Sequence, residues 1–227
     1  NDRLYFSTDF FWTEPEPSLV KYGARDVIDT FAAMVKEGGD IAWGLAYHPY
    51  PDPLTEPEFW DDGDTGRAIE SVDTRIVNFN NLHIMTDYMN RQELLGPDGR
   101  TRHIILSEQG FTSKSATRGD VEQIQAAAMA YAYYIADSNP YIDAILMNRQ
   151  VDNVDETNTS VALGLWQCDM SSPAVVKATM RKPVWTVFRV IDRKSSLEYT
   201  EFAKEIIGIE KWSDVIPNFK WKRYENP

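Results

Sequence analysis

The sequence offers little for covalent cross-linking or metal binding. Only one of its 227 residues is a cysteine, Cys168, which excludes an internal disulfide framework and a thiolate metal cluster. The three histidines, His48, His83 and His103, form neither an H-x-H nor an H-E-x-x-H pair, so a zinc hydrolase is disfavoured. A G-x-S-x-G segment, the mark of a serine nucleophile elbow, is absent as well. We therefore expect neither a metal nor another cofactor.

Long apolar runs and positive charge are also scarce. No apolar run approaches the roughly 18 residues that a membrane span needs, so no membrane partner is expected. Lys and Arg number 23 against 35 Asp and Glu, which gives a net charge of −12. Such a field repels phosphate backbones and argues against nucleic acid as a partner. The hydrophobic fraction of 43% is too high for general disorder, so a folded protein is expected.

What is present is an apolar strand followed by an amphipathic helix, four times along the chain. The predicted strands cover residues 4–8, 41–47, 103–107 and 144–147. The predicted helices have their apolar stripes within residues 27–35, 69–89, 124–135 and 184–191. Such alternation is typical of parallel β/α architecture. The aromatic tail is expected to pack onto the outside of the fold with Trp212, Phe219, Trp221 and Tyr224.

Four β/α units form either a small open sheet or half of an eight-stranded barrel. An open doubly wound sheet often carries a glycine-rich loop after its first strand, and the segment Ser7-Thr8-Asp9-Phe10 has no glycine. Every predicted strand instead ends in polar or aromatic residues, as strands around a barrel active site do. We predict an α/β fold, a (β/α)₈ TIM barrel, in which residues 1–227 form a single domain covering about the last four units. A self-contained domain of about four strands is the alternative.

Glu108 is the sharpest candidate for chemistry. It directly follows the apolar strand Ile104-Ile105-Leu106-Ser107, at a point where burial and neighbouring groups tune a carboxylate. With Glu108 pointing inward, the period of two predicts that Leu106 and Ile104 point inward as well. The alternative is a strand-end glutamate that pairs with an arginine for structural reasons.

The segment His48-Pro49-Tyr50-Pro51 is the second candidate. It ends the second predicted strand, where His48 or Tyr50 is placed to donate a hydrogen bond to a carboxylate or a sugar hydroxyl. The alternative is a proline-stiffened strand exit with a histidine that serves only the fold.

Weaker candidates are groups that sugar-binding sites commonly use, namely planar amides, a guanidinium, a carboxylate and aromatic platforms. Those at strand ends or in the acidic loop 52–67 are Asp9, Trp12, Trp60, Asn148, Arg149 and Gln150. An acidic aromatic loop is otherwise more often a solvated surface loop.

Taken in order, these segments resemble clan A glycoside hydrolases. Residues 104–110 resemble the seventh strand of those barrels, where a glutamate followed shortly by glycine is the nucleophile. Residues 48–51 resemble the end of the sixth strand, where a histidine and a tyrosine line the catalytic subsite and hold the nucleophile. Residues 162–166 and 181–185 are similar to the closing segment. The nearest resemblance is to an uncharacterised bacterial family of glycosyl-hydrolase-like TIM barrels.

The resemblance implies a retaining glycosidase that cleaves O-glycosyl bonds, as in polysaccharide degradation. Glu108 would be the nucleophile, with His48 and Tyr50 holding it ionised and oriented. Clan A enzymes carry their acid/base glutamate after the fourth strand, usually in an Asn-Glu pair, and residues 1–227 contain no such pair. We therefore expect this chain to be the C-terminal half of a longer protein, with the acid/base residue upstream and the isolated chain inactive.

Three further expectations follow. The glycosidase resemblance implies that the partner is an oligosaccharide or polysaccharide and, by analogy, that the parent protein is secreted or periplasmic. The two open strand edges favour a homodimer of the isolated chain. A non-catalytic carbohydrate-binding barrel that keeps the cleft is the alternative function, and the missing Asn-Glu pair is its best support.

Overall fold

The computed structural model describes residues 4–14 and 22–224. The chain divides into two compact units, which are described separately here. Unit 1 comprises residues 1–50, 60–109 and 139–146, and unit 2 comprises residues 51–59, 110–138 and 147–227. Among the described residues, no helix combines the length and the apolar character needed to cross a membrane.

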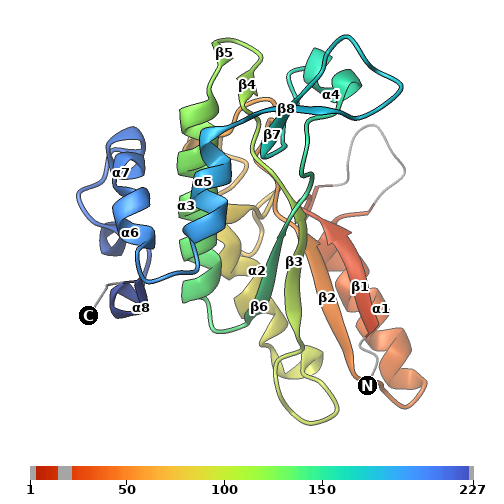
Figure 1. Cartoon of the computed structure of the whole chain (residues 1–227). Coiled ribbons are helices and arrows are strands. Elements are labelled where there is room, and N and C mark those ends of the chain that lie inside the picture. The colour runs from red at the N-terminus through yellow and green to blue at the C-terminus, as the bar shows by residue number, and fades with distance from the viewer. Residues whose placement is uncertain (1–3, 15–21, 225–227) are drawn as a thin grey trace. The chain divides into compact units, whose positions relative to one another are not determined.

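Unit 1 is a β/α layer built around a parallel four-stranded sheet (Figure 1). The strands, in the order in which they lie, are β1 (Leu4–Asp9), β2 (Trp43–His48), β3 (Ile104–Gln109) and β6 (Ile142–Met147). Its helices are α1 (Ala24–Glu37) and α2 (Leu82–Met89), with 3₁₀ turns at Phe79–Asn81 and Gln92–Leu94. Each strand lies beside the strand of this sheet that follows it in sequence, as in successive β/α crossovers. The mixed α/β architecture is therefore confirmed, and closure into a full barrel stays a prediction.

Helix α1 covers one face of this sheet. Phe31 of α1 stacks on Phe6 of β1 with 4.3 Å between ring centroids, and both rings lie edge-on to Trp43 of β2. Offset and edge-to-face aromatic pairs of this kind add to the energy of area burial. Phe31 of the predicted stripe thus packs on the sheet, but Met34 is 68% exposed, and the buried residues of α1 are Ala24, Ile28 and Ala32.

The side-chain alternation along β3 differs from the one expected. Ile104 pairs with Leu45 and Leu106 with Tyr47, and all four side chains are fully buried. Because residues in register share a face, Ile105 lies with Ala46 on the opposite face. The expectation that Ile104 and Leu106 point inward with Glu108 is wrong, since these bulky residues are on the face that carries Leu45 and Tyr47.

The second predicted helix is much shorter than its apolar stripe indicated. Residues 69–76 form turns, and α2 begins only at Leu82. The side chain of Asn78 accepts a hydrogen bond from the Asn80 amide, and Asn81 donates to the Ile69 and Ile76 carbonyls. Asn side chains that bond nearby backbone groups compete with helix formation, so the α-helix begins only after Asn81.

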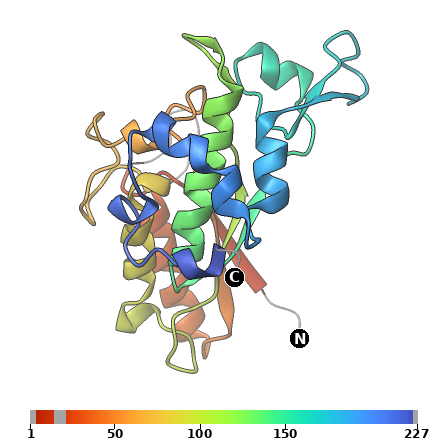
Figure 2. The same ribbon diagram turned by 60° about the vertical axis from the view of Figure 1, so that its left-hand side comes forward.

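Unit 2 is built on the long helix α3 (Glu122–Ser138), along which α5 and α7 lie (Figure 2). Its other helices are α4 (Val154–Asn158), α5 (Pro183–Val190), α6 (Ser196–Tyr199), α7 (Glu201–Ile207) and α8 (Trp221–Tyr224), with a 3₁₀ turn at Trp212–Asp214. Two small antiparallel pairs complete it, β4 (Lys114–Ser115) with β5 (Gly119–Asp120) and β7 (Trp166–Cys168) with β8 (Ala178–Arg181). A further 3₁₀ turn, Phe59–Asp61, falls where the two units meet in sequence.

The aromatic tail forms part of the core of unit 2. Tyr134 of α3 lies 4.8 to 5.2 Å, between ring centroids, from Trp212, Phe219 and Tyr224. Trp212 and Tyr224 are buried, whereas Trp221 is exposed. The tail therefore packs against helix α3 of unit 2, with Tyr134 as its buried aromatic partner.

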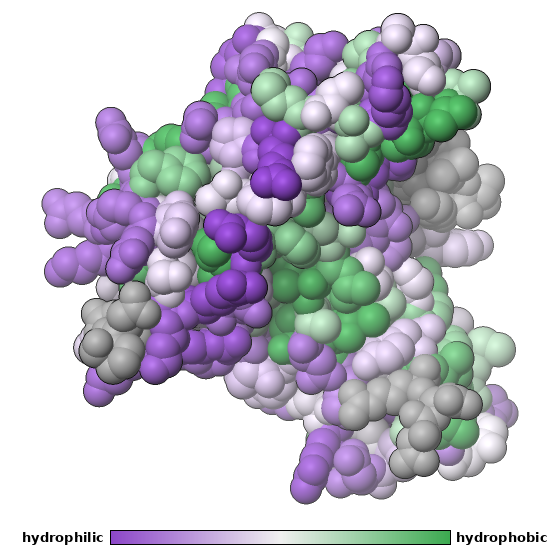
Figure 3. Space-filling model, in the orientation of Figure 1, coloured by the Kyte–Doolittle hydropathy of each residue, from purple (hydrophilic) through white to green (hydrophobic). Residues whose placement is uncertain are grey.

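Strands β1 and β6 are the edges of the four-stranded sheet, and β6 is partly apolar at the surface. Leu146 of β6 is 45% exposed, and Figure 3 shows hydrophobic side chains gathered over this part of the sheet. Exposed edges and apolar patches commonly find partners. Self-association of the isolated chain stays a prediction, which light scattering checks: a monomer across the micromolar range contradicts it.

Candidate active site

The candidate site lies in unit 1, at the carboxyl ends of three neighbouring strands. Asp9 ends β1, His48 ends β2, and Glu108 is the penultimate residue of β3. Carboxyl ends of parallel strands meet at one edge of a sheet, which is where α/β proteins bind ligands. The register, with Asp9 directly opposite His48, places these side chains close together.

Tyr50 and Glu108 form one half of the site. The Tyr50 hydroxyl donates a 2.8 Å hydrogen bond to Oε1 of Glu108. Tyr50 is only 8% exposed, so its ring is held by packing, and a proline on each side restricts the backbone. A buried, stiffened donor fixes the direction of the Glu108 carboxylate.

Asp9, His48 and Ser107 form the other half, a chain of hydrogen bonds across β1, β2 and β3. Nδ1 of His48 lies 2.9 Å from Oδ1 of Asp9, and Nε2 lies 3.1 Å from Oγ of Ser107 and 3.3 Å from Oγ of Ser7. Because a carboxylate only accepts, Nδ1 carries the proton donated to Asp9. In the tautomer with its proton on Nδ1, Nε2 is the acceptor for a serine hydroxyl.

This arrangement assigns the expected contacts differently. The sequence did not decide whether His48 or Tyr50 donates a hydrogen bond to a carboxylate, and in the structure Tyr50 donates to Glu108. His48 is held between Asp9 and the two serines, with 18% of its side chain exposed against 35% for Asp9. Asp9 is hydrogen-bonded to His48 in this structure, and its expected contact with substrate stays a prediction.

Tyr47 supports the site from the other face of β2. It is fully buried, and its hydroxyl donates a 2.8 Å hydrogen bond to the Val77 carbonyl. Burial, and secondarily the negative charge of Asp9, raises the pKa of Tyr47 well above its usual value. The phenol therefore stays protonated, and it anchors the strand that carries His48.

Trp12 is a core residue in this structure. It has no exposed surface, its indole N–H donates a 3.0 Å hydrogen bond to the Val72 carbonyl, and its ring meets Tyr88 edge-on at 5.1 Å. An aromatic platform for a sugar needs an open face. We therefore leave Trp12 out of the proposed site: the structure contradicts this expected contact, since the loop 72–74 and α2 cover the ring.

Trp60 lies on the loop that was expected to form a rim. Its side chain is partly exposed, and the neighbouring Asp62 is buried and accepts a 2.5 Å hydrogen bond from Asn78. This hydrogen bond joins the loop to the segment before α2, so it restrains the backbone next to Trp60.

Asn148, Arg149 and Gln150 belong to unit 2. Arg149 has a left-handed backbone with φ of 101° and pairs with Glu156 at 2.6 Å. Asn148 is half-buried, and Gln150 is exposed, with its carbonyl accepting from the amides of Leu165 and Trp166. Their role as substrate contacts stays a prediction.

Ser7 and Ser107 are members of the site that sequence reasoning missed. Ser7 lies two residues before Asp9, and Ser107 lies directly before Glu108. The register of the strands was the signal that would have found them, because it places Ser107 across from His48. Among the described residues, no group of three or more His, Cys, Asp or Glu side chains is arranged to hold a metal.

A protein-family model covers nearly all of the chain. It matches residues 1–215 and is described as a family of unknown function, DUF5722. The chain belongs to this family. No curated protein matches the sequence.

Among solved structures, this DUF5722 chain is similar to a family 39 glycoside hydrolase from the gut symbiont Bacteroides cellulosilyticus WH2. The two are 20% identical with a TM-score of 0.47, over 74% of this chain and 30% of that one. This chain thus spans about a third of the length of that hydrolase.

Proposed function

We propose that this chain belongs to a retaining glycoside hydrolase in which Glu108 is the nucleophile. The observation that carries the proposal is the 2.8 Å hydrogen bond from Tyr50 to Glu108 at the carboxyl ends of β2 and β3. A carboxylate fixed in direction at the ligand-binding edge of a parallel sheet is what nucleophilic attack on a sugar requires. The resemblance of residues 48–51 and 104–110 to clan A strand ends supports the same roles.

The proposed reaction has two steps. Glu108 attacks the anomeric carbon and forms a glycosyl ester, while an acid/base carboxyl group protonates the departing oxygen. The same group then takes a proton from water, which hydrolyses the ester and releases the sugar. Retaining enzymes hold the two carboxyl groups about 5–5.5 Å apart. We propose that the second group comes from a part of the parent protein that precedes β1 in barrel order.

The remaining residues have positioning and binding roles in this proposal. Tyr50 orients Glu108, and Asp9 with Ser107 orients His48, whose exposed edge contacts the sugar. Trp60, Asn148, Arg149 and Gln150 are the proposed substrate contacts. The substrate is an oligosaccharide or polysaccharide. Residues 1–227 alone should not turn over glycosides, because general acid help is typically worth about 10²–10⁴-fold.

A carbohydrate-binding barrel without catalysis is the second candidate function. The absence of an Asn-Glu pair from residues 1–227 favours it. It predicts that the parent protein binds polysaccharide but hydrolyses none, and that Glu108 contributes only to affinity.

The chain Asp9–His48–Ser107 has the order of a serine hydrolase triad, and we assign it a positioning role instead. Ser107 lies within strand β3, whereas a serine nucleophile stands on a sharp turn that exposes its oxygen. Nε2 of His48 is also shared with Ser7, so the base is not dedicated to one hydroxyl.

The test measures hydrolysis of a panel of aryl glycosides by the parent protein and its Glu108→Gln variant. We expect a loss of at least about 10³-fold in kcat/KM, equivalent to about 4 kcal/mol of transition-state stabilisation. Glu70→Gln is the matched control, because Glu70 is exposed and contacts only the exposed His83 among the described residues. Unchanged hydrolysis by Glu108→Gln overturns the assignment. Polysaccharide binding without hydrolysis by the parent supports the second candidate.

A further inference from the structure

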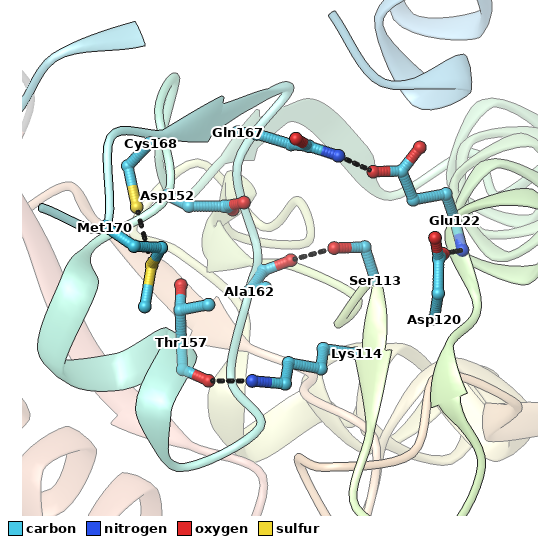
Figure 4. A pocket seen from close by; sticks show the side chains of 10 residues that line it. All are labelled: Ser113, Lys114, Asp120, Glu122, Asp152, Thr157, Ala162, Gln167, Cys168 and Met170. Carbon is cyan, nitrogen blue, oxygen red and sulfur yellow. Dashed lines mark hydrogen bonds between the residues drawn. The ribbon is translucent and has the colours of Figure 1, made fainter. Parts of the chain in front are cut away.

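Unit 2 contains a pocket that the proposed hydrolysis does not use. Its volume is about 240 Å³, and ten side chains from the segments around β4, β5, α4 and β7 line it (Figure 4). Pockets for drug-sized ligands are about 300–1,000 Å³, so this one suits a single small ring.

The walls of the pocket are rich in hydrogen-bonding groups whose directions are fixed. Glu122, the first residue of α3, accepts a 2.6 Å hydrogen bond from the Gln167 amide of β7. Lys114 of β4 donates to the Thr157 carbonyl at 3.2 Å, which engages one of the three protons of its ammonium group. Asp120 accepts from the Glu122 backbone amide at 3.0 Å. The pocket thus offers carboxylates, an amide and an ammonium group held by protein contacts.

Part of the pocket wall is apolar. Cys168 and Met170 lie across the pocket from Glu122 and Asp120 in Figure 4, with the thiol 3.5 Å from the methionine sulfur. Ala162 adds a methyl group. Hydrogen-bonding groups beside apolar surface match a sugar ring, which has hydroxyls at its rim and C–H groups on its faces. Lys182 pairs with Asp152, and the wall holds the Lys114 ammonium as well as the carboxylates of Asp120 and Glu122, so the opposite charges largely balance and a neutral ligand is favoured.

We infer that this pocket binds a single neutral sugar residue, contacted by Glu122, Gln167 and Lys114. The site lies wholly within unit 2 and does not depend on Glu108 acting as a nucleophile. Its natural ligand is then one ring of a free sugar or of a glycan chain end.

Two measurements on the full chain test this. Ligand-observed saturation-transfer NMR with D-glucose, D-galactose, D-mannose, D-xylose and L-arabinose shows whether any of them binds. The single cysteine then reports the place, because Cys168 is part of the wall and no other thiol reacts. At a sugar concentration of twice Kd, alkylation of Cys168 by iodoacetamide should slow about threefold.

Variants assign the contacts. Lys114→Met and Glu122→Gln should each weaken binding about tenfold or more, as expected for hydrogen bonds to charged groups. Lys194→Met and Glu205→Gln are the matched controls, since both residues are exposed and neither lines the pocket. No NMR signal with any sugar overturns the inference. So does a signal that survives both pocket variants, which places binding elsewhere, or protection of Cys168 by methylammonium but by no sugar.

Discussion

Two polar clusters of this chain, one in each unit, differ in burial and therefore in what they do. In unit 2, Lys182 is fully buried and Asp152 is 4% exposed, and the ammonium group donates to Asp152, Ser113 and the Ala162 carbonyl at 2.8 to 3.1 Å. In unit 1, Asp9 and His48 make an equally short contact of 2.9 Å but remain open to solvent. In the first cluster the charges are paired with each other and buried, and in the second they keep more solvent-exposed surface.

The pKa values of the buried pair show the cost of closure. Burial raises the pKa of Asp152 against the opposing pull of Lys182, and burial lowers the pKa of Lys182 against the pull of Asp152. A pair held this way is worth little net, but losing one partner leaves an uncompensated buried charge. Substitution in the unit 2 cluster should therefore lower the stability of the protein. Substitution in the unit 1 cluster should lower its activity and leave it folded.

The largest expected effect is on stability, from Lys182→Met. The change leaves Asp152 buried without its cation, so the free energy of unfolding should fall by about 3–5 kcal/mol. Urea unfolding measures it. Lys177→Met is the control, because Lys177 pairs with Asp169 but is 66% exposed, and its loss should cost under about 1 kcal/mol. Equal effects of the two variants would show that burial is not the deciding factor.

Tyr50→Phe should have the opposite signature, with activity lost and stability kept. Removing the hydroxyl removes the Tyr50 hydrogen bond to the Glu108 carboxylate. A hydrogen bond to a charged group is worth about 1.5–3 kcal/mol, or about 10–150-fold in kcat/KM of the parent protein. Tyr22→Phe serves as the control, since Tyr22 is highly exposed. If Tyr50→Phe hydrolyses aryl glycosides as fast as Tyr22→Phe, the hydrogen bond has no functional role.

Trp12→Phe separates a core residue from a sugar platform. We expect a loss of about 1–2 kcal/mol in unfolding free energy, because the indole hydrogen bond to the Val72 carbonyl and part of the buried ring disappear. KM for the substrate should not change. A raised KM with unchanged stability would restore Trp12 to the substrate site.

The smallest expected effect concerns alkaline pH and Tyr88. Burial, followed by the hydrogen bond to Asp29 and the charge of that residue, raises the pKa of Tyr88 to about 12. Since this folded-state pKa lies above the unfolded value of about 10, the stabilising contribution is complete below pH 10 and is lost as pH rises towards 12. Tyr88→Phe should therefore flatten the decline of stability between pH 10 and 12. An unchanged decline would mean that other tyrosines account for it.

The strand ends were predictable because apolar runs and the polar residues that stop them are local features. Ile104 to Ser107 predicts a strand by itself, and Glu108 follows from it. The helix expected over 69–89 failed because an apolar stripe does not reveal that Asn78 and Asn81 bond the backbone instead. Trp12 was misplaced for a related reason: an aromatic residue after a strand suits a core as well as a platform.

The pocket of unit 2 could not be predicted. Its residues come from positions 113–170 in separate short elements, and only tertiary packing brings Glu122 to Gln167. Ser107 was predictable only in part, because its place beside His48 depends on the register of two strands that pair across about 60 residues of sequence.

The central claim is that Glu108 forms the covalent bond to the sugar, and one measurement addresses it directly. The parent protein is incubated with an activated 2-deoxy-2-fluoroglycoside of the sugar that it hydrolyses, which slows the second step and traps the glycosyl ester. Peptide mass spectrometry then locates the added sugar. The proposal predicts a single adduct on Glu108 and none in the Glu108→Gln variant. An adduct on another carboxylate, with Glu108 unmodified, would contradict it.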